Sequence, residues 1–238
     1  MSRLRHRMRW LARTPFHPQW LLGPRRPPAR IAEVKGVLLD VGSADGWLED
    51  HLGPDAEYVS LDYPPTGQAL YGARPSVYAD AARMPFGDGT VHAIACLEVI
   101  EHVPCPDLVL GEMHRVLKPG GHAFLSMPFL YPIHDAPHDF TRLTLHGWRQ
   151  QAAQHGFLLQ QIAKRTHSLR TAGLLACLAI SGAVATRAGL VGVLFLPLAA
   201  ASVLMINVLT FLGSLLLPDW EAMGSGYELV LLKPESSL

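Results

Sequence analysis

The sequence VLLDVGSADGW, residues 37–47, joins a short apolar run to a turn of small residues. An apolar run that ends in an acid, here Asp40, and a glycine turn predicts a buried strand. The small residues Gly42, Ala44 and Gly46 let the backbone approach a ligand closely, and the N-terminus of an expected following helix favours an anion. The G-x-G-x-x-G dinucleotide fingerprint is excluded, because its third glycine would fall on Trp47.

Outward from this turn, strand-like and helix-like segments alternate along the chain. Short apolar runs predict strands, and two segments with helical spacing predict helices. We expect strands at 36–41, 57–62, 76–80, 91–99, 121–129, 157–163 and 226–233, and helices at 107–117, before the KPGG turn at 118–121, and at 144–157. This alternation predicts an α/β fold with a Rossmann-like, doubly wound and mostly parallel sheet.

Residues 171–217 interrupt this pattern with a long segment that carries one charged side chain, Arg187. A membrane-spanning helix takes about 20 apolar residues. We therefore expect an inserted apolar helical hairpin, interrupted at Pro197, that lies in one leaflet or spans the membrane tightly. The alternatives are a buried helical pair and a dimer interface. Basic residues before the insert favour a cytoplasmic side for the main domain: Lys164, Arg165 and Arg170.

The formal net charge of zero combines unlike parts of the chain. Residues 1–30 hold eight arginines and no acid, so the rest carries 12 basic and 20 acidic side chains. A basic tail on an acidic body favours contact with an anionic surface, with a solvated tail as the alternative. Composition excludes disordered, collagen-like and disulfide-scaffold chains, and the three cysteines suit a reducing compartment. We expect three parts: residues 1–30, a main domain of 31–170 with 219–238, and a membrane-associating insert, 171–218.

The turn motif D-x-G-x-x-x-G, from Asp40 to Gly46, resembles motif I of the class I S-adenosylmethionine-dependent methyltransferases. Ala44 and Asp45 depart from its commonest G-x-G-x-G form. Further landmarks of the family follow in order: an acid that ends the second strand, the stretch ADAARMPFGDGTVHAIACLEVIEHV at 79–103, and EMHRVLKPGGHAFLSMP at 112–128. The resemblance covers about residues 35–165 and the last strand. It implies a seven-stranded sheet, methyltransferase activity and S-adenosylmethionine as cofactor.

The resemblance also implies cofactor contacts for particular residues. Asp62 would accept hydrogen bonds from both ribose hydroxyls, for which a carboxylate offers two oxygens. Asp80 and Ala81 map onto the stretch that contacts the adenine. Five more residues, in the turn and at the end of the fourth strand, complete this set: Asp40, Gly42, Ala44, Gly46 and Glu98. The alternative for Asp62 and Asp80 is that each caps a local turn.

Glu98, Glu101 and His102 occupy positions i, i+3 and i+4 where the fourth strand is expected to end. On a helical turn they would share one face, and such a trio can hold a divalent cation such as Mg²⁺. Some members of the resembled family that methylate catechol-type quinone precursors or RNA ends use this kind of trio for a metal. We favour His102 as a general base or substrate-orienting group, because neutral imidazole takes a hydroxyl proton near pH 7. Capping of the local backbone is a further alternative.

The loop after the fifth expected strand, YPIHDAPHDFTR at residues 131–142, crowds titratable side chains between aromatic ones. In a doubly wound sheet such a loop lies over the carboxyl ends of the strands, where ligands bind. We predict a substrate lid in which Tyr131, His134 and His138 lie near the acceptor, with the two histidines as catalytic candidates. The alternative is that Asp139 and Arg142 pair with each other or cap the following helix.

Together these features predict a methyltransferase at the membrane face that O-methylates a lipid-linked, glycan or other amphiphilic acceptor. Two alternatives stay open: a metal-assisted O-methyltransferase of a quinone precursor, and a membrane-anchored, non-catalytic binding protein on the same fold. The membrane and an amphiphilic substrate are the expected partners, and a homodimer through the apolar insert is a further expectation. Nucleic acid is not an expected partner, because only the arginine tail favours it.

Overall fold

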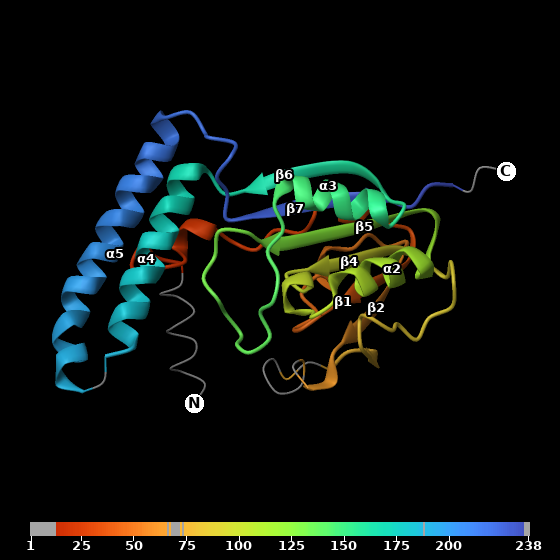
Figure 1. The fold of residues 1–238 in the computed structure, drawn as a ribbon, viewed down its shortest axis with the longest axis horizontal. Helices are drawn as coiled ribbons and strands as arrows, with labels where there is room; N and C mark the ends of the chain where they lie inside the picture. The colour runs from red at the N-terminus through yellow and green to blue at the C-terminus, as the bar shows by residue number, and fades with distance from the viewer. Residues whose placement is uncertain (1–12, 66, 68–71, 73, 188, 236–238) are drawn as a thin grey trace. The chain divides into compact units, whose positions relative to one another are not determined.

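The computed structural model of the chain describes residues 13–65, 67, 72, 74–187 and 189–235 (Figure 1). Residues 1–12, with four arginines of the expected basic segment, lie outside the described residues. The chain divides into two compact units: a sheet unit of residues 26–129, 133–163 and 227–238, and a hairpin unit of residues 1–25, 130–132 and 164–226. These boundaries differ from the expected ones, because the described residues before Arg26 pack with the apolar helices instead of forming a separate segment.

The sheet unit is built on a seven-stranded sheet with the strand order β3-β2-β1-β4-β5-β7-β6 (Figure 1). The strands are β1 (Gly36–Val41), β2 (Ala56–Asp62), β3 (Val77–Tyr78), β4 (Val91–Leu97), β5 (Leu117–Pro128), β6 (Leu158–Arg165) and β7 (Gly226–Leu232). The pairs β1–β2, β1–β4, β2–β3 and β4–β5 are parallel. The expected doubly wound, mostly parallel α/β sheet is confirmed. Its strand order reverses between β1 and β4, and sheets of this kind bind ligands at the carboxyl ends of such strands.

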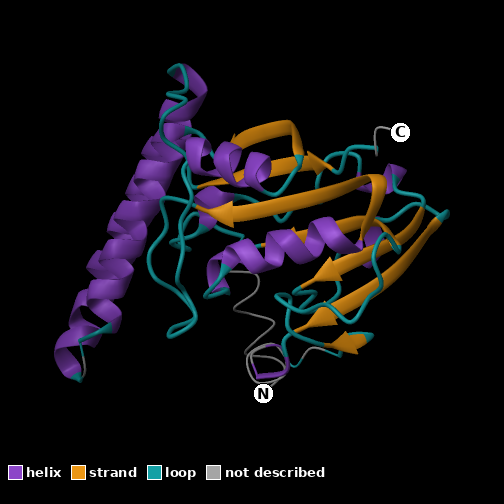
Figure 2. Cartoon of the chain, turned by 45° about the vertical axis from the view of Figure 1, so that its right-hand side comes forward, coloured by secondary structure: helices purple, strands orange, loops and turns teal. Residues whose placement is uncertain are grey.

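Hydrophobic layers form on both faces of this sheet. The larger core includes side chains of α2 (Pro106–Val116) and α3 (Leu145–Gln154), whose Met113 and Trp148 are fully buried. Figure 2 shows helices lying along the strands of the sheet. A smaller core contains Leu38 and Phe124 and the buried residues of the 3₁₀ helix η2 (Ile31–Glu33) and its neighbours. Both strand faces are therefore apolar, which explains why the central strands are continuous apolar runs in the sequence.

Two local expectations differ from the structure. The segment after the β1 turn forms a three-residue 3₁₀ helix, η3 (Glu49–His51), and the expected helix there is wrong. Gly53 and Pro54 follow at once, and they stop a helix before it gains length. α2 does end before the KPGG turn, but β5 begins at Leu117 and includes those residues. The Gly120 N–H donates to the Lys233 carbonyl oxygen at 2.9 Å, and this pairing extends the strand.

The hairpin unit contains two apolar helices that lie side by side, α4 (Ser168–Ala185) and α5 (Leu190–Leu216) (Figure 1). The expected apolar helical hairpin is confirmed. The expected interruption at Pro197 is wrong, because α5 continues through it. The proline removes one backbone donor, and the long run of helix on both sides outweighs that loss. Both helices are long and apolar enough to cross a membrane, judged by length and composition.

A fully buried amide, that of Asn207 on α5, connects the N-terminal segment to this hairpin. Its Nδ2 donates to the carbonyl oxygens of Pro15 at 2.6 Å and His17 at 3.0 Å, and its Oδ1 lies 3.4 Å from the Cys177 thiol of α4. Elsewhere α5 exposes large apolar side chains along its length: Val193, Leu194, Phe195, Leu196, Leu198, Met205, Leu209, Leu212, Leu215 and Leu216. The helix thus buries an amide and exposes leucines.

Candidate active site

The turn after β1 has the backbone conformation of a ligand cradle. Gly42, Ala44 and Gly46 have φ angles of 73°, 47° and 69°, in the left-handed region that favours glycine. Ala44 adopts this conformation at a modest cost in strain, since its side chain is small. The residues that the sequence assigned to the turn therefore form it.

Contacts of Gly42 place this turn beside the ends of β2 and β4. Its N–H donates to the Leu61 carbonyl oxygen at 2.8 Å, which holds the turn against β2. A Cβ atom on Gly42 would lie 2.3 Å from a methyl carbon of Val99, so no larger residue fits there without displacing the loop after β4. The β1 turn and the β4 loop consequently form one surface at the carboxyl ends of the strands.

Two buried acids support the cradle. The Asp40 carboxylate accepts a hydrogen bond of 2.7 Å from the Tyr58 hydroxyl, so it is anchored between β1 and β2. The Asp62 carboxylate accepts the N–H groups of Ala44 at 2.9 Å and of Tyr63 at 2.8 Å. Asp62 therefore faces the turn and caps the local backbone, and its contact with a ribose remains a prediction.

The two residues assigned to the adenine follow β3. Asp80 is exposed, and its carboxylate accepts the Ala82 N–H at 2.8 Å. Ala81 is buried and belongs to the larger core. The turn-capping alternative describes Asp80 in this structure, and its contact with a cofactor remains a prediction.

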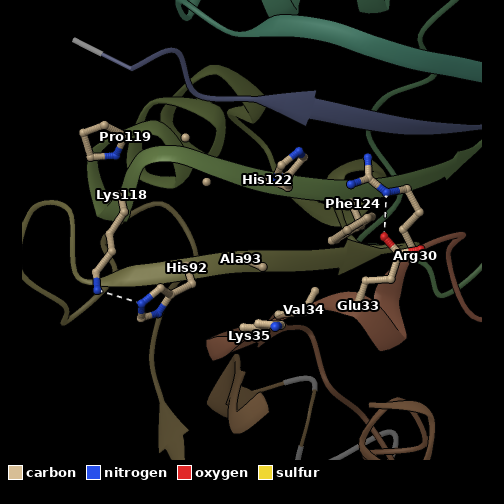
Figure 3. Close-up of a pocket in the computed structure, with 12 residues that line it drawn as sticks. Arg30, Glu33, Val34, Lys35, His92, Ala93, Lys118, Pro119, His122 and Phe124 are labelled. Atoms are coloured by element: carbon tan, nitrogen blue, oxygen red, sulfur yellow. Dashed lines mark hydrogen bonds and ion pairs between the residues drawn. The ribbon is translucent and has the colours of Figure 1, made fainter. Parts of the chain in front are cut away.

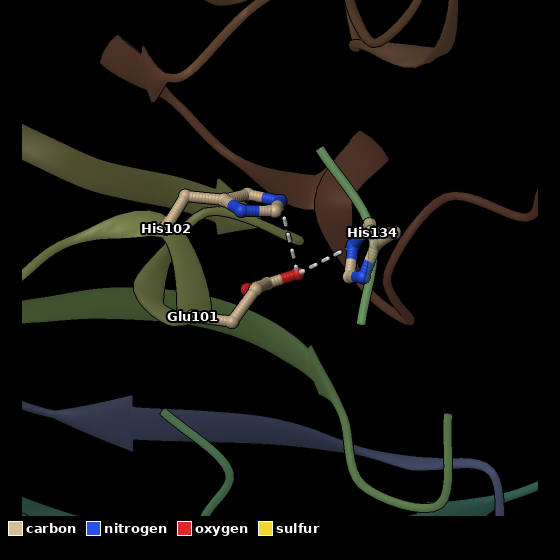
Figure 4. Close-up of side chains that lie close together, drawn as sticks. All are labelled: Glu101, His102 and His134. Carbon is tan, nitrogen blue, oxygen red and sulfur yellow. Dashed lines mark ion pairs between the residues drawn. The ribbon is translucent and has the colours of Figure 1, made fainter. Parts of the chain in front are cut away.

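The acids and histidines after β4 do not converge in the combination that the spacing suggests. Glu98 accepts a hydrogen bond of 2.6 Å from the Ser126 hydroxyl at the end of β5. Glu101 and His102 lie on the 3₁₀ helix η5 (Ile100–His102), and His134 joins them from the loop after β5 (Figure 4). One ligand atom from each of these three side chains lies within 4.8 Å of the other two.

Both imidazoles are held through Nδ1 and present Nε2 to Glu101. His102 Nδ1 donates to the carbonyl oxygen of His138, and His134 Nδ1 lies 3.2 Å from the Asp139 carboxylate. A neutral imidazole with its proton on Nδ1 has a free lone pair on Nε2. The Nε2 atoms of His102 and His134 lie 3.7 Å and 4.0 Å from Glu101 Oε1 (Figure 4). The cluster therefore brings two imidazole nitrogens and one carboxyl group together.

The surroundings shift the pKa values of Glu101 and the nearby Asp139 in opposite directions. Burial and the neighbouring Glu98 carboxylate raise the pKa of Glu101 to about 8. Neither of its carboxyl oxygens has a hydrogen-bond partner among the described residues. The hydrogen bonds from Arg142 lower the pKa of Asp139 to about 2, so Asp139 stays ionised and fixes the His134 ring. A buried carboxyl that faces two imidazoles and has no hydrogen bond among the described residues fits a site that receives a cation or a proton.

Residues 131 and 132 of the loop 131–142 belong to the hairpin unit, and the remaining residues belong to the sheet unit. His138 contributes its backbone carbonyl to His102, and its ring packs edge-on against Phe140. Tyr131 belongs to the hairpin unit, where its hydroxyl accepts a hydrogen bond from the Gln19 amide. Asp139 and Arg142 pair with each other, as the alternative interpretation held, and Thr144 caps α3.

Sequence reasoning missed Tyr58 and Ser126, which hold Asp40 and Glu98. The register of the strands carries a signal for both. Ser126 is the β5 partner of Leu97, which precedes Glu98. Tyr58 lies across from Leu38 on the neighbouring strand, two residues before Asp40. Both pairings depend on the order of the strands, which is a tertiary property.

Comparisons with known proteins agree with this geometry. A family model described as a methyltransferase domain matches residues 17–171. Similar curated proteins include the ubiquinone biosynthesis O-methyltransferases of Xanthomonas oryzae, 32% identical over 130 residues, and of Dechloromonas aromatica, 35% identical over 102 residues. These alignments cover 49% and 37% of this chain and 54% and 43% of the relatives. The chain thus spans about half the length of the curated relatives it matches, or less.

Solved structures of methyltransferases share the fold. A Bacillus halodurans protein described as a methyltransferase superposes with a TM-score of 0.51 at 18% identity, over 86% of this chain and 96% of that one. Haemonchus contortus phosphoethanolamine N-methyltransferase 2, solved with S-adenosyl-L-methionine, gives a TM-score of 0.50 at 14% identity, over 97% of this chain and 53% of that one. At these identities the likeness concerns the fold.

Proposed function

Because the chain belongs to the class I S-adenosylmethionine-dependent methyltransferases, we propose that it O-methylates an amphiphilic, lipid-linked or glycan acceptor at a membrane face. The observation that carries the chemistry is the convergence of Glu101, His102 and His134 beside the β1 turn. The observation that carries the location is the exposed apolar surface of α5.

The β1 turn and its acids have the properties that the cofactor requires. Gly42, Ala44 and Gly46 give the turn its left-handed backbone, and Asp62 turns its carboxylate toward that turn. Asp80 and Ala81 would flank the adenine. Bound S-adenosylmethionine supplies an electrophilic methyl group.

The histidines prepare the acceptor oxygen. In the proposed reaction, His102 Nε2 accepts the hydroxyl proton of the acceptor, while the His138 carbonyl holds its Nδ1–H and fixes the tautomer. His134, held by Asp139, orients the same hydroxyl from the opposite side of Glu101. Glu101 is largely neutral at pH 7 because of its raised pKa, and on ionising it would stabilise the imidazolium that His102 becomes.

The hairpin would bring the acceptor within reach by binding the membrane. A polar solvent does not favour a helix that exposes Leu194 and Leu209 at 68% and 61%, and a lipid environment does. Lys164 and Arg165, before α4, place the entry to the hairpin on the cytoplasmic side in this proposal.

Transfer of a labelled methyl group to fractionated membrane lipids tests the reaction. The purified full chain should label a lipid or glycolipid fraction. The variant Asp62→Ala should bind the cofactor at least about tenfold more weakly, because a charge-assisted hydrogen-bond acceptor is lost. Asp55→Ala, which changes an exposed acid with 67% side-chain exposure, is the matched control. Full cofactor affinity in Asp62→Ala would contradict the proposed cofactor site.

Partitioning into vesicles tests the location. Leu209→Asp should lower binding to vesicles by about tenfold or more, since an acid in the middle of a membrane helix is costly. Leu108→Asp changes an equally exposed leucine on α2, with 57% exposure, and should leave binding unchanged. Equal effects of the two substitutions would show that α5 does not contact lipid.

A second candidate is a metal-assisted O-methyltransferase of a quinone precursor. The names of the curated relatives favour it, and so do the buried oxygens of Glu101, which have no hydrogen bond among the described residues and face the Nε2 atoms of His102 and His134. Glu101, His102 and His134 would hold the divalent cation, which would lower the pKa of an acceptor hydroxyl. Loss of activity on exhaustive chelation, with recovery on adding Mg²⁺ or Zn²⁺, is the expected result. Activity that survives chelation would leave His102 as the base.

A further inference from the structure

A cavity of about 310 Å³ lies in the sheet unit beside the first residues of β4, His92 and Ala93 (Figure 3). Its walls are the segment around η2, the start of β4 at His92 and the first residues of β5. His92 and Leu97, the last residue of β4, are five positions or about 17 Å apart along the strand, and the cluster of Glu101, His102 and His134 lies beyond Leu97. A ligand here is therefore distinct from the cofactor and from the methyl acceptor.

The cavity concentrates positive charge on an otherwise acidic body. Its charged and imidazole groups are Arg30, Lys35, Lys118, His92, His122 and one acid, Glu33. Glu33 accepts a hydrogen bond of 3.0 Å from Arg30, and the Lys35 ammonium lies 3.8 Å from the Asp55 carboxylate, so two of the three permanent cations each face an acid. Residues 31–238 hold 20 acidic and 12 basic side chains, and a basic cavity within them is not a consequence of composition.

His92 and Lys118 contact each other through nitrogen atoms at the wall of the cavity. The Val37 N–H donates to His92 Nδ1 at 2.9 Å, which assigns the ring proton of neutral His92 to Nε2. His92 Nε2 lies 2.8 Å from the Lys118 ammonium (Figure 3). Two donors thus face each other across this contact, and an anionic oxygen beside them would accept from both.

Glycines hold this arrangement in place. A Cβ atom on Gly36, whose φ is 75°, would lie 2.6 Å from the His92 ring, and one on Gly121 would lie 2.9 Å from the His92 carbonyl oxygen. His92 therefore packs directly on backbone at both positions. The apolar part of the cavity is formed by Val34, Ala93 and the buried Phe124.

We propose that this cavity is a binding site for the phosphate group of a phosphate ester. Lys118 and His92 would donate to the phosphate oxygens, and Arg30 and Lys35 would add charge at the rim. The organic part of the ester would lie against Val34 and Phe124. The ester is either a soluble metabolite or the headgroup of an anionic lipid, since both present the same chemistry.

Calorimetric titration of the full chain in an uncharged detergent tests the proposal. The ligands are inorganic phosphate, glycerol 3-phosphate and a phosphatidic acid with two six-carbon chains, used below its micelle concentration. Saturable binding of glycerol 3-phosphate that is tighter than that of inorganic phosphate is expected. Tighter binding still of the short-chain lipid identifies a lipid headgroup, and equal binding identifies a soluble ester. Absence of saturable binding for all three ligands would overturn the proposal.

Variants show whether any binding occurs in this cavity. Lys118→Ala should weaken binding of glycerol 3-phosphate by about tenfold, and Lys118→Arg should recover part of that loss. Arg149→Ala removes an exposed arginine of α3 and should change the affinity by less than about twofold. Equal weakening by Arg149→Ala would show non-specific attraction and overturn the site. In the unmodified chain, the His92 imidazole signals should shift during the titration, which tests the site without relying on any substitution.

Discussion

Helix α2 of the sheet unit buries Val109, Leu110, Met113 and Val116, whereas α5 of the hairpin unit buries Val203 and Asn207 and exposes leucines along its length. α2 has one apolar stripe that faces a sheet, as helices of water-soluble proteins do. α5 has the reverse arrangement, with its amide inside and its apolar side chains outside. Under the proposed function the two helices face different solvents, so substitutions should separate the tasks of the two units.

The largest expected effect concerns the chemistry in the sheet unit. His102→Ala should lower the rate of methyl transfer by about 10²–10⁴-fold, because a general base contributes that much. Cofactor affinity and binding to vesicles should stay unchanged. A rate of methyl transfer within about threefold of the unmodified chain would remove His102 from the reaction and leave His134 as the base.

A matched pair of leucines tests the comparison of α2 with α5 directly. Leu110→Ala removes a fully buried side chain and should lower the free energy of unfolding by about 2–5 kcal/mol. Leu209→Ala, at a position with 61% exposure, should change it by less than about 0.5 kcal/mol. Chemical denaturation in a mild detergent measures both. A large loss in Leu209→Ala would mean that α5 is covered by protein, for instance by a second copy of the chain.

The pH dependence of stability tests the buried carboxyl group. Since the pKa of Glu101 is raised from 4.5 to about 8, its neutral form stabilises the folded state fully below pH 4.5, and this contribution is lost as pH rises toward 8. Glu101→Gln should lack this loss. Between pH 5 and pH 8 in a chelating buffer, the difference in unfolding free energy between the two proteins should change by about 3 kcal/mol. If the unfolding free energies of both proteins changed with pH in the same way, the pKa of Glu101 would not be raised in the folded state.

The smallest expected effect concerns the polar contact inside the hairpin unit. Asn207→Ala leaves the carbonyl oxygens of Pro15 and His17 without their donor, at a cost of about 1–2 kcal/mol. The N-terminal segment should then be cleaved faster by trypsin at Arg13, with no change in methyl transfer. Asn207→Gln is the control that keeps an amide. Unchanged cleavage in Asn207→Ala would show that Trp20 and Phe211 hold the segment without it.

Much of the sheet unit follows from the sequence because its signals are local. The apolar runs that became β1, β2 and β4 are continuous, and the helical spacing of α2 and α3 is clear within each segment. The β1 turn is also local, since Gly42 and Gly46 adopt conformations that favour glycine. Among the described residues, no long helix follows this turn. Gly53 and Pro54 disfavour a helix there, and the expectation of a helix gave these two residues too little weight.

Local sequence patterns predicted only part of the candidate site. Spacing grouped Glu98 with Glu101 and His102, on the assumption of a helical turn. Glu98 instead has a φ of 58° and turns to Ser126, so the periodic argument fails at that residue. The composition of the loop after β5 indicated that its histidines could be functional. No local pattern in the sequence indicated that His134, and not His138, would place its imidazole beside Glu101.

By itself, the sequence determined the alternation of strands and helices, the glycine turn and the two apolar helices, because each depends on residues that are close together in the chain. Only the tertiary structure decided that His134 meets Glu101 and His102, since parallel pairing of β4 with β5 brings their carboxyl ends together. The tertiary structure likewise decided that Asn207 binds the backbone of Pro15 and His17. Long-range contacts of this kind are fixed by the order of strands and by packing, which no local pattern specifies.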